Sequence, residues 1–461
     1  MTDIRNANNN LPPIAEKVQA ALARAAIRTT INSKAAYDAA AAKLKGLAQR
    51  GDVPDADASY ARSQDFSDLA SYRSVIKTRQ LTDRFGFSDP FYRSFDKCSG
   101  AYVEAEGKTY VNFASYDYLG LSSHPHVVAS AKAAIDQYGT SVSASRIVAG
   151  NRPIHCHLES ELAALYGTEA ALTFVSGHAT NVTTIGTVLD GDDAIFCDEL
   201  VHNSVHVGAT LSKAQIFTFR HNDLGSLEFL LRQHRSNFRN VLIAVEGLYS
   251  MDGDVPDLPS LIALKQRYGC WLMVDEAHAL GVLGDRGCGS AEYHAIDTKD
   301  VDIWMGTLSK TLAGCGGYIA GSEALITILK YRAAGQVYSV GMAPAVAGAA
   351  LAALDVFKAE PERVKRVREN GQLFLEEARR HGLDTCTSEG FSIVPVMVGD
   401  TIAAGKLTDR MFASGINVMP IIYPAVPLKA ARLRFFITVN HSSDDIRRAV
   451  SITAEQLRKI R

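Results

Sequence analysis

Short apolar runs recur along the middle of the chain, and each is followed by glycine or by polar and turn residues. The runs are ALTFVSG, AIFCDEL, QIFTFRH, NVLIAVEG, CWLMVDEAH, DIWMGTLSK and GGYIAG. From Val127 onward, helix-like segments separate many of them, and this alternation predicts a mostly parallel sheet covered by helices. Active sites in such sheets lie beyond the carboxyl ends of the strands, so the residues that follow each run are candidate site residues.

The two ends of the chain have other patterns. YVEAEGKTYVNFAS at 102–115 alternates like a β-hairpin with Glu-Gly at its turn. Beyond Ala345 a long helical stretch leads into an α+β region at about 390–461, with strands expected near FSIVPVMV and LRFFITV. We therefore expect an N-terminal extension (1–95), a large domain with its leading segment (96–345) and a small domain (346–461).

The N-terminal extension is rich in alanine, and the spacing of its apolar residues predicts two helices within 1–50. Residues 1–50 contain eight Lys and Arg but three Asp and Glu, whereas the whole chain has a net charge of −2. Such a local excess of positive charge is typical of a solvated helical face. The alternative is a docking surface for an acidic partner.

Composition restricts the class of protein. A chain of 461 residues is too long for one ordinary core, and 47% hydrophobic with 21% charged residues is typical of a globular enzyme. The net charge of −2 does not favour binding to nucleic acid. No apolar run approaches the roughly 20 residues of a membrane span, and the N-terminus has no apolar signal core. Seven scattered cysteines without metal-type spacing favour reduced thiols, so we expect a cytoplasmic protein without a metal site.

Asp275 follows the apolar run CWLMV, where a carboxylate is either buried and paired or directed at a ligand. A buried carboxylate beside a pyridine nitrogen keeps that nitrogen protonated, so that the ring accepts electrons. Aspartate is also a common N-cap before a segment such as Glu-Ala-His-Ala-Leu, and this residue alone leaves both interpretations open. His278, three residues on, either donates to a ring oxygen or is simply packed or solvated.

Two further turns after apolar runs carry small, hydroxyl or imidazole side chains. SGHATN places Ser176, Gly177 and His178 at the expected start of a helix, whose free N–H groups suit a phosphate. His202 follows AIFCDEL, and its imidazole either stacks on a flat cofactor or is a structural loop residue. Each of these signals alone is weak, because many α/β turns look the same.

The run DIWM leads into TLSKTLAGCGG (307–317), which contains a single lysine, Lys310. A lysine amine with a lowered pKa can bond covalently to a cofactor aldehyde, and the hydroxyls of Thr307 and Ser309 suit a phosphate. Glycines let the backbone approach closely, and three follow the lysine: Gly314, Gly316 and Gly317. A phosphate-binding helix start, Asp275 and a lysine 35 residues later together predict a pyridoxal-phosphate site.

Longer motifs resemble those of the α-oxoamine synthases, fold-type I pyridoxal-phosphate enzymes that condense an amino acid with an acyl thioester. The resemblance runs from about residue 100 to 455, and EG-(Y/F)-SMDGD together with VDEAH-(S/A)-G is its most specific part. The motifs are YDYLGLSSHP (116–125), YGTEAALTFVSGHATN (166–181), DELVHNS (198–204), RHN (220–222), VEGLYSMDGD (245–254), VDEAHALGVLGDRGCG (274–289), GTLSKTLAGCGG (306–317) and RLRFFITVNHS (432–442).

The resemblance implies a role for each matching residue. Lys310 would hold the cofactor covalently and Asp275 would pair with its pyridine nitrogen. His278 would contact the ring oxygen, and His202 would stack on the ring. The other residues expected to bind the cofactor are Ser176, Gly177, His178, Ser250, Thr307 and Ser309.

The same resemblance concerns the substrate. Arg434 would bind the amino-acid carboxylate, with Arg432 as the alternative because the two are only two positions apart. Tyr116 stands before DYLG, where serine palmitoyltransferases usually have tyrosine and other members of the family usually have asparagine. Tyr116 and the RHN motif, which resembles bacterial palmitoyltransferases, favour L-serine and a long acyl donor.

Two departures from the family pattern concern the substrate rather than the cofactor. His178 stands where Phe or Tyr is common after Ser-Gly. In YSVGMAP (338–344), Val340 and Gly341 stand where hydroxyl residues often reach the phosphate of a neighbouring subunit, so only Ser339 would do so here.

We therefore predict a homodimeric α/β enzyme of fold-type I, with a mostly parallel sheet in the large domain and a smaller α+β C-terminal domain. It would join L-serine to a long-chain acyl thioester, carried by coenzyme A or by acyl carrier protein, and release CO2 to give a 3-ketosphinganine-type α-amino ketone. A lipid substrate would allow peripheral membrane association. The alternatives are a synthase that uses glycine or alanine, a carrier-protein-dependent synthase of a secondary metabolite, an aminotransferase, and a non-catalytic subunit, against which Lys310 argues.

Overall fold

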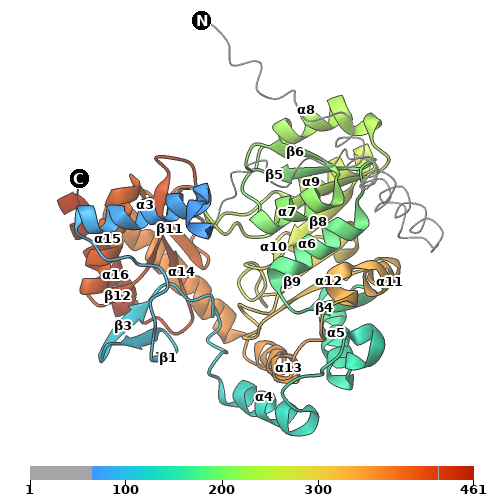
Figure 1. Cartoon of the computed structure of the whole chain (residues 1–461), viewed down its shortest axis with the longest axis horizontal. Coiled ribbons are helices and arrows are strands. Elements are labelled where there is room, and N and C mark those ends of the chain that lie inside the picture. Colours follow the sequence, from blue (N-terminus) through green and yellow to red (C-terminus); the bar gives the residue numbers. More distant parts are fainter. Residues whose placement is uncertain (1–64, 424, 461) are drawn as a thin grey trace, which may run out of the picture. The chain divides into compact units, whose positions relative to one another are not determined.

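A computed structural model describes residues 65–423 and 425–460 (Figure 1). The described residues separate into a unit that ends at Lys77 and a second unit that begins at Thr78. The described part of the N-terminal extension contains a short 3-10 helix, Phe66–Asp68, and helix α3 (Ala70–Phe85). The two helices predicted within 1–50 lie outside the described residues. No described helix combines the length and the apolar character that crossing a membrane requires.

A seven-stranded sheet forms the centre of the large domain. Its strands are β4 (Ala170–Phe174), β5 (Ala194–Asp198), β6 (Gln215–Phe219), β7 (Val241–Glu246), β8 (Trp271–Asp275), β9 (Ile303–Thr307) and β10 (Gly317–Gly321). Their order in the sheet is β4-β10-β9-β8-β7-β5-β6. Strand β10 is antiparallel to both of its neighbours, and the other adjacent strands are parallel. The predicted mostly parallel sheet is confirmed, with the GGYIAG run as the antiparallel exception.

Successive residues of each strand enter opposite cores, so both faces of the sheet need helices (Figure 1). Trp304 of β9 packs with residues of the helices on one face, and Met305 packs with those on the other. The helices of the first face are α4 (Pro125–Tyr138), α5 (Pro153–Tyr166), α8 (Leu224–His234), α9 (Leu258–Tyr268) and α13 (Pro344–Ala359). Those of the second face are α6 (Gly177–Val188), α7 (Asn203–Ser212) and α11 (Glu323–Arg332). Two short helices, α10 (Ser290–Tyr293) and α12 (Ala334–Val337), complete this part of the chain.

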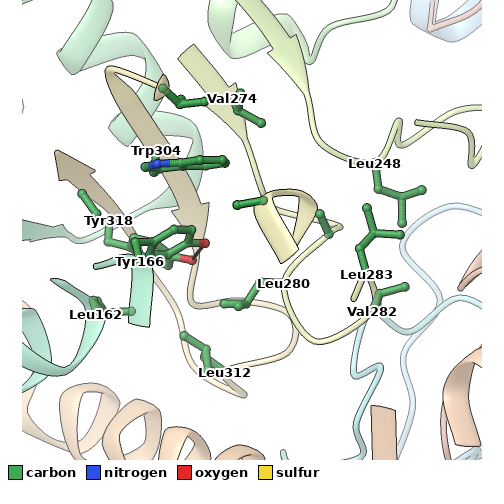
Figure 2. Packing of buried hydrophobic residues seen from close by; sticks show 14 of the residues in the cluster. Leu162, Tyr166, Leu248, Val274, Leu280, Val282, Leu283, Trp304, Leu312 and Tyr318 are labelled. Atoms are coloured by element: carbon green, nitrogen blue, oxygen red, sulfur yellow. Dashed lines mark hydrogen bonds between the residues drawn. The ribbon is translucent and has the colours of Figure 1, made fainter. Parts of the chain in front are cut away.

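The loops that follow β8 and β9 are anchored in the first core, as Figure 2 shows. Leu280 and Leu312, one from each loop, are buried in the same cluster as Tyr166 and Tyr318. The hydroxyls of these two tyrosines are hydrogen-bonded at 2.8 Å, which satisfies both polar groups inside an apolar region. The loops that carry Asp275 and Lys310 are therefore fixed by packing on the side away from the site.

The small domain is built around an antiparallel sheet in the order β11-β14-β13. Its elements are α14 (Glu362–Arg380), β11 (Ile393–Gly399), α15 (Thr401–Ala413), β12 (Ile416–Asn417), β13 (Met419–Ile421), β14 (Ala431–Phe436) and α16 (Ser443–Ile460). The hairpin predicted at 102–115 is confirmed, because β2 (Tyr102–Ala105) and β3 (Lys108–Asn112) pair across a Glu106–Gly107 turn with positive φ at both residues.

A second small sheet contains this hairpin, β1 (Lys97–Ser99) and β12. Strand β12 pairs in parallel with β3, so that Ile416 lies opposite Val111. Residues 97–112, which the sequence pattern placed with the large domain, thus share a sheet with a strand from the C-terminal part. The division at 1–95, 96–345 and 346–461 stays a prediction.

Candidate active site

The predicted site residues follow parallel strands that end at one edge of the large sheet. In register, Glu246 of β7 lies opposite Asp275 of β8, and Asp275 lies opposite Met305 of β9. Strands β4 and β9 run in the same direction because both are antiparallel to β10. The fold therefore brings the following residues to this edge: Ser176, Gly177, His178, His202, Ser250, Asp275, His278, Thr307, Ser309 and Lys310.

Asp275 is buried, and two donors orient its carboxylate. One oxygen accepts from the Asn181 amide at 2.9 Å and the other from the Ala277 N–H at 3.0 Å. The Asn181 amide also donates to Ser204 Oγ at 2.9 Å, which contacts His202 Nδ1 at 2.7 Å. The residues after Asp275 form turns, so the alternative interpretation as a helix N-cap was wrong.

Lys310 is half-buried, and its amine has no ion-pair partner among the described residues. Burial lowers its pKa to about 8, although the charges of Asp275 and Glu246 oppose the shift. The next residue, Thr311, donates to the Leu280 carbonyl at 2.7 Å and so fixes the backbone beside the lysine. The backbone at Lys310 is therefore fixed, and its amine loses a proton more readily than that of an exposed lysine.

Glu246 was missed among the sequence candidates, although it ends the apolar run VLIAV as Asp275 ends the next one. Its side chain is only 3% exposed. One carboxylate oxygen accepts from the Ser250 N–H at 2.9 Å, and the other has no hydrogen-bond partner among the described residues. Burial, with a further contribution from the Asp275 charge, raises the pKa of Glu246 to about 8. Glu246, whose raised pKa favours the protonated form, thus lies beside Asp275, whose carboxylate accepts two hydrogen bonds.

His278 is buried between aromatic side chains. Its Nδ1 atom lies 2.6 Å from the Tyr118 hydroxyl, and its ring is parallel to that of Phe436 at 6.2 Å between centroids. Burial, together with the nearby Lys310 charge, lowers the pKa of His278 well below its usual value, so the ring is neutral. With Tyr118 as the donor to Nδ1, the remaining N–H is on Nε2, the nitrogen left to contact a bound group.

The two candidate arginines lie on the same face of β14 but differ in their partners. Arg432 is buried and forms an ion pair with Asp252. Arg434 has no carboxylate within ion-pair distance among the described residues; it donates to the Ser250 carbonyl at 2.8 Å and lies over the ring of Phe436 at 4.6 Å. Its buried Nε has no hydrogen-bond partner, and burial lowers the pKa of its guanidinium. Arg434 is thus the arginine that is available for an anionic ligand.

Helix α6 begins at the phosphate site that the sequence predicts. Ser176 caps this helix by accepting from the Ala179 N–H at 3.4 Å. A Cβ atom at Gly177 would lie 2.7 Å from Thr307 Oγ1, so glycine lets the start of the helix pack against the end of β9. The Thr307 hydroxyl donates its proton to the Gly316 carbonyl at 2.9 Å. The free N–H groups at this helix start are suited to an anion.

The three glycines after Lys310 serve contacts within the protein. A Cβ atom at Gly317 would lie 2.4 Å from Thr180 Oγ1, and one at Gly316 would lie 2.6 Å from the Phe174 carbonyl oxygen. At Gly314 a Cβ atom would make only ordinary contacts, from 3.4 Å. Gly316 and Gly317 therefore bring β10 close to α6 and β4, and a close approach to a ligand stays a prediction.

The remaining predicted residues line the open side of the site. The ring of Tyr116 is 40% exposed, lies edge-on to Phe436 at 4.7 Å and has Lys310 Nζ 5.9 Å from its centroid. The rings of His178 and His202, both exposed, lie edge-on to each other at 6.1 Å. Ser309 is also exposed, with a long contact of 3.4 Å to the Gly316 carbonyl.

Comparison with known proteins places this geometry in a family. Residues 108–452 match the family model for aminotransferase class I and II. The chain belongs to the aminotransferase class I and II family. It is 41% identical over 368 residues to an 8-amino-7-oxononanoate synthase from Geobacter sulfurreducens, which covers 79% of this chain and 93% of the relative. A second such synthase, from Beijerinckia indica, is 40% identical over 356 residues and covers 77% of this chain and 90% of the relative.

Solved structures include a serine palmitoyltransferase (SPT) with pyridoxal phosphate, which has a TM-score of 0.82 and 25% identity over 86% of this chain and 99% of that one. This aminotransferase class I and II protein is therefore a pyridoxal-phosphate-dependent acyltransferase of the α-oxoamine synthase type, with the fold-type I architecture. Its site fits the cofactor, because a lysine of lowered pKa, a buried oriented aspartate and a free helix start meet at one edge of the sheet. Palmitoyltransferases appear among the solved structures, whereas the curated relatives are 8-amino-7-oxononanoate synthases.

Proposed function

We propose that this α-oxoamine synthase joins L-serine to a long-chain acyl thioester and releases CO2 and a thiol, giving a 3-ketosphinganine-type α-amino ketone. Pyridoxal phosphate, when bound, supplies an aldehyde for a lysine amine and a ring that accepts electron density from the amino-acid Cα. We assign Lys310 to the covalent link, Asp275 to the pyridine nitrogen, His278 to the ring oxygen and His202 to the ring face. The residues assigned to the rest of the cofactor are Ser176, Gly177, His178, Ser250, Thr307 and Ser309.

The observation that carries this proposal is the contrast between the two arginines. Arg432 is neutralised by Asp252, but Arg434 is largely desolvated and lacks a carboxylate partner among the described residues. Burying a charge without a partner is costly, and a substrate carboxylate would remove that cost by forming a bidentate pair. Arg434 would thereby hold the amino acid in a fixed orientation.

The other charged groups then have distinct tasks. Because burial brings the pKa of Lys310 to about 8, roughly a tenth of its amine is uncharged at pH 7, far more than for an exposed lysine, and this form is able to take the Cα proton. Asp275, buried and oriented by its two donors, would stabilise positive charge on a ring nitrogen. The core beneath both residues excludes water and strengthens these interactions.

Tyr116 supports serine as the amino acid. Its partly exposed ring lies 5.9 Å from Lys310 Nζ and packs edge-on against Phe436, so Tyr116 borders the place where an amino acid would bind. A polar phenol there suits a substrate with a hydroxymethyl side chain. The second candidate is a synthase that uses alanine or glycine, which is favoured by the 40–41% identity to proteins named 8-amino-7-oxononanoate synthase.

Product analysis separates these candidates. We would incubate the holoenzyme with serine, alanine or glycine and a panel of acyl thioesters of different length, and identify products by mass spectrometry, with Lys310→Ala as the inactive control. We expect the mass of a 3-ketosphinganine-type base from serine and a long-chain thioester. If products form only from alanine or glycine, the serine proposal is rejected and the second candidate function takes its place.

The donor is proposed to be acyl carrier protein rather than coenzyme A, because residues 1–50 carry a charge excess of eight basic to three acidic residues. Carrier proteins are typically acidic, and charge complementarity speeds encounter. Deleting residues 1–50 should raise KM for acyl carrier protein and leave KM for acyl-coenzyme A unchanged. Equal loss with both donors would reject this recruitment role.

We also propose a homodimer. Three apolar side chains are unusually exposed where Ser145 bridges to Val340: Val148 at 80%, Tyr338 at 88% and Val340 at 49%. A second subunit would cover such a patch. Light scattering should give twice the monomer mass, and Val148→Asp should reduce it. The seven free cysteines support a reducing cytoplasmic location, and peripheral membrane association stays a prediction.

A further inference from the structure

His221, from the RHN motif, lies between two buried carboxylates that have no role in the site described above. Its Nδ1 atom is 2.9 Å from Asp198 Oδ1, and its Nε2 atom is 2.9 Å from Asp254 Oδ2. A neutral imidazole has one N–H and cannot donate to both carboxylates, so the ring donates in both contacts only when both nitrogens are protonated. The geometry therefore favours an imidazolium between the two aspartates.

The groups around this ring agree with a positive charge. Burial opposes the charge, but the hydrogen bonds of Asp198 and Asp254 outweigh burial and raise the pKa of His221 to about 10. The ring of Tyr249 lies edge-on at 4.5 Å. Asp254 Oδ2 also accepts from Asn222 Nδ2 at 3.2 Å and from Thr387 Oγ1 at 3.0 Å. Asp254 is thus held by three side-chain groups from two separate segments, residues 221–222 and Thr387.

Asp254 ends a closed loop, residues 249–254. The Tyr249 N–H donates to the Asp254 carbonyl at 2.9 Å, and the Gly253 N–H donates to the Tyr249 carbonyl at 2.9 Å. Gly253 has a φ of +73°, and a Cβ atom there would lie 2.2 Å from the Ile393 carbonyl oxygen, so only glycine fits. The 249–254 loop is therefore a compact unit, and a displacement of Asp254 is transmitted to its other residues.

The other side of the 249–254 loop contacts the active site. The Ser250 carbonyl accepts from Arg434 Nη1 at 2.8 Å, and Met251 Sδ lies 3.7 Å from the same nitrogen. The Ser250 N–H donates to Glu246 at 2.9 Å. One loop thus joins the His221 ring to the guanidinium of Arg434.

We propose that His221 is a positioning residue: as an imidazolium it holds Asp254 and the 249–254 loop, whose Ser250 carbonyl orients Arg434 toward the amino-acid carboxylate. The proposal rests on the proposed function, in which Arg434 binds that carboxylate. It also accounts for the His-Asn part of the RHN motif, since both side chains donate to Asp254.

The test is His221→Gln in the holoenzyme. Glutamine is neutral and has an oxygen that must face one of the two carboxylates, so the side chain at this position loses its charge and one of its two hydrogen bonds, to Asp198 or to Asp254. We expect KM for the amino acid, and its Kd from absorbance titration, to rise about tenfold or more, because small misplacements of a positioning group have large effects. Cofactor content, kcat and KM for the acyl thioester should change by less than about threefold.

The matched control is His234→Gln. His234 stacks on Phe217 of the strand that precedes His221, at 4.6 Å between ring centroids, and among the described residues it makes no hydrogen bond, ion pair or ring contact with the 249–254 loop. We expect wild-type KM values for both substrates. A uniform effect of both variants would indicate a general loss of structure and overturn the positioning role.

Two further measurements keep the outcomes separate. If Arg434→Ala leaves amino-acid binding unchanged, the proposed carboxylate site fails. Another outcome is that Arg434→Ala weakens amino-acid binding while His221→Gln retains both full cofactor content and normal amino-acid binding. In that case only the positioning proposal fails. Nitrogen NMR of histidine-labelled wild-type enzyme needs no variant to be functional, and near neutral pH it should show both His221 nitrogens protonated. A single protonated nitrogen would overturn the proposal even if His221→Gln does not fold.

Discussion

The two edges of the large sheet each hold a partly buried lysine, but the two amines have different surroundings. At the amino edge, Lys265 Nζ contacts the Asp302 carboxylate and the Asp300 carbonyl, both at 2.7 Å. At the carboxyl edge, Lys310 has no such partner among the described residues, and burial lowers its pKa to about 8. The amine of Lys265 is thus engaged by partners within the protein, whereas that of Lys310 loses its proton more readily than an exposed lysine does. The same residue type therefore has a structural contact at one edge and an amine without an ion-pair partner among the described residues at the other.

Empty volume does not make this distinction. A cavity of about 560 Å³ lies at the amino edge, beside the start of β8 at Trp271, the start of β9 at Ile303 and the end of β10 at Gly321. At the carboxyl edge, by contrast, Glu246 and Arg434 each have a buried polar atom without a hydrogen-bond partner among the described residues. Native proteins rarely leave such groups unsatisfied unless a ligand completes them. At this edge, two buried polar atoms without partners among the described residues, rather than a large empty volume, accompany the candidate site.

The largest effect should come from exchanging each lysine. Lys310→Ala should abolish turnover and the borohydride-reducible link to the cofactor, because no other amine described at this edge replaces it. Lys265→Ala should leave turnover unchanged and lower stability slightly. Peptide mapping of borohydride-reduced wild-type protein checks the assignment, and a pyridoxyl group on any lysine other than Lys310 would refute it.

The two arginines of β14 should separate binding from stability. Arg434→Ala should raise KM for the amino acid by a factor of roughly 30 to several thousand, since losing one partner of a desolvated charge pair costs about 2–5 kcal/mol. KM for the acyl thioester should barely change.

Arg432→Ala should lower the free energy of unfolding by about 3–5 kcal/mol, because Asp252 would remain buried without its partner. It should raise KM for the amino acid less than Arg434→Ala does, and only because Asp252 belongs to the 249–254 loop. Denaturant titration and steady-state kinetics distinguish the two variants. The opposite assignment, with Arg432→Ala impairing amino-acid binding and Arg434→Ala impairing only stability, would move the carboxylate site.

Asp275→Asn should reduce turnover by a factor of about 100 or more with the fold intact, because a neutral amide cannot hold a ring nitrogen protonated. Asp302→Asn is the control at the other edge, where the carboxylate accepts from the Leu272 N–H and pairs with Lys265. It should leave turnover at the wild-type level. Near-normal turnover of Asp275→Asn with bound cofactor would remove the role we give that residue.

The smallest effect concerns Glu276, the neighbour of Asp275 that is turned away from the site. Burial raises its pKa to about 7, although donors from Ser290 oppose the shift. The folded state therefore holds this proton between the unfolded pKa of 4.5 and about 7, and stability falls as pH rises through that window. Glu276→Gln should remove this slope and stabilise the protein at higher pH by about 1–3 kcal/mol. Thermal unfolding across the window measures it, and a slope equal to that of wild type would contradict the burial argument.

Much of the candidate site at the carboxyl edge was predictable from local patterns. Asp275, Lys310 and the start of α6 each stand at or just after the end of a buried strand. Because both faces of the sheet are covered, the residues of such a strand are mostly apolar, and the end of the apolar run marks the end of the strand in the sequence. Glu246 carries the same signal and was overlooked. The alternative helix N-cap at Asp275 looked equally good locally, and only the turns formed after β8 excluded it.

The sequence by itself determined which segments become strands, where each strand ends and which residue types stand there. Only the tertiary structure decided which charged groups have partners: Arg432 with Asp252, Lys265 with Asp302, and His221 between Asp198 and Asp254. The physical reason is that a local pattern sets burial, whereas the state of a buried charge depends on atoms from distant segments that strand order brings within hydrogen-bond distance.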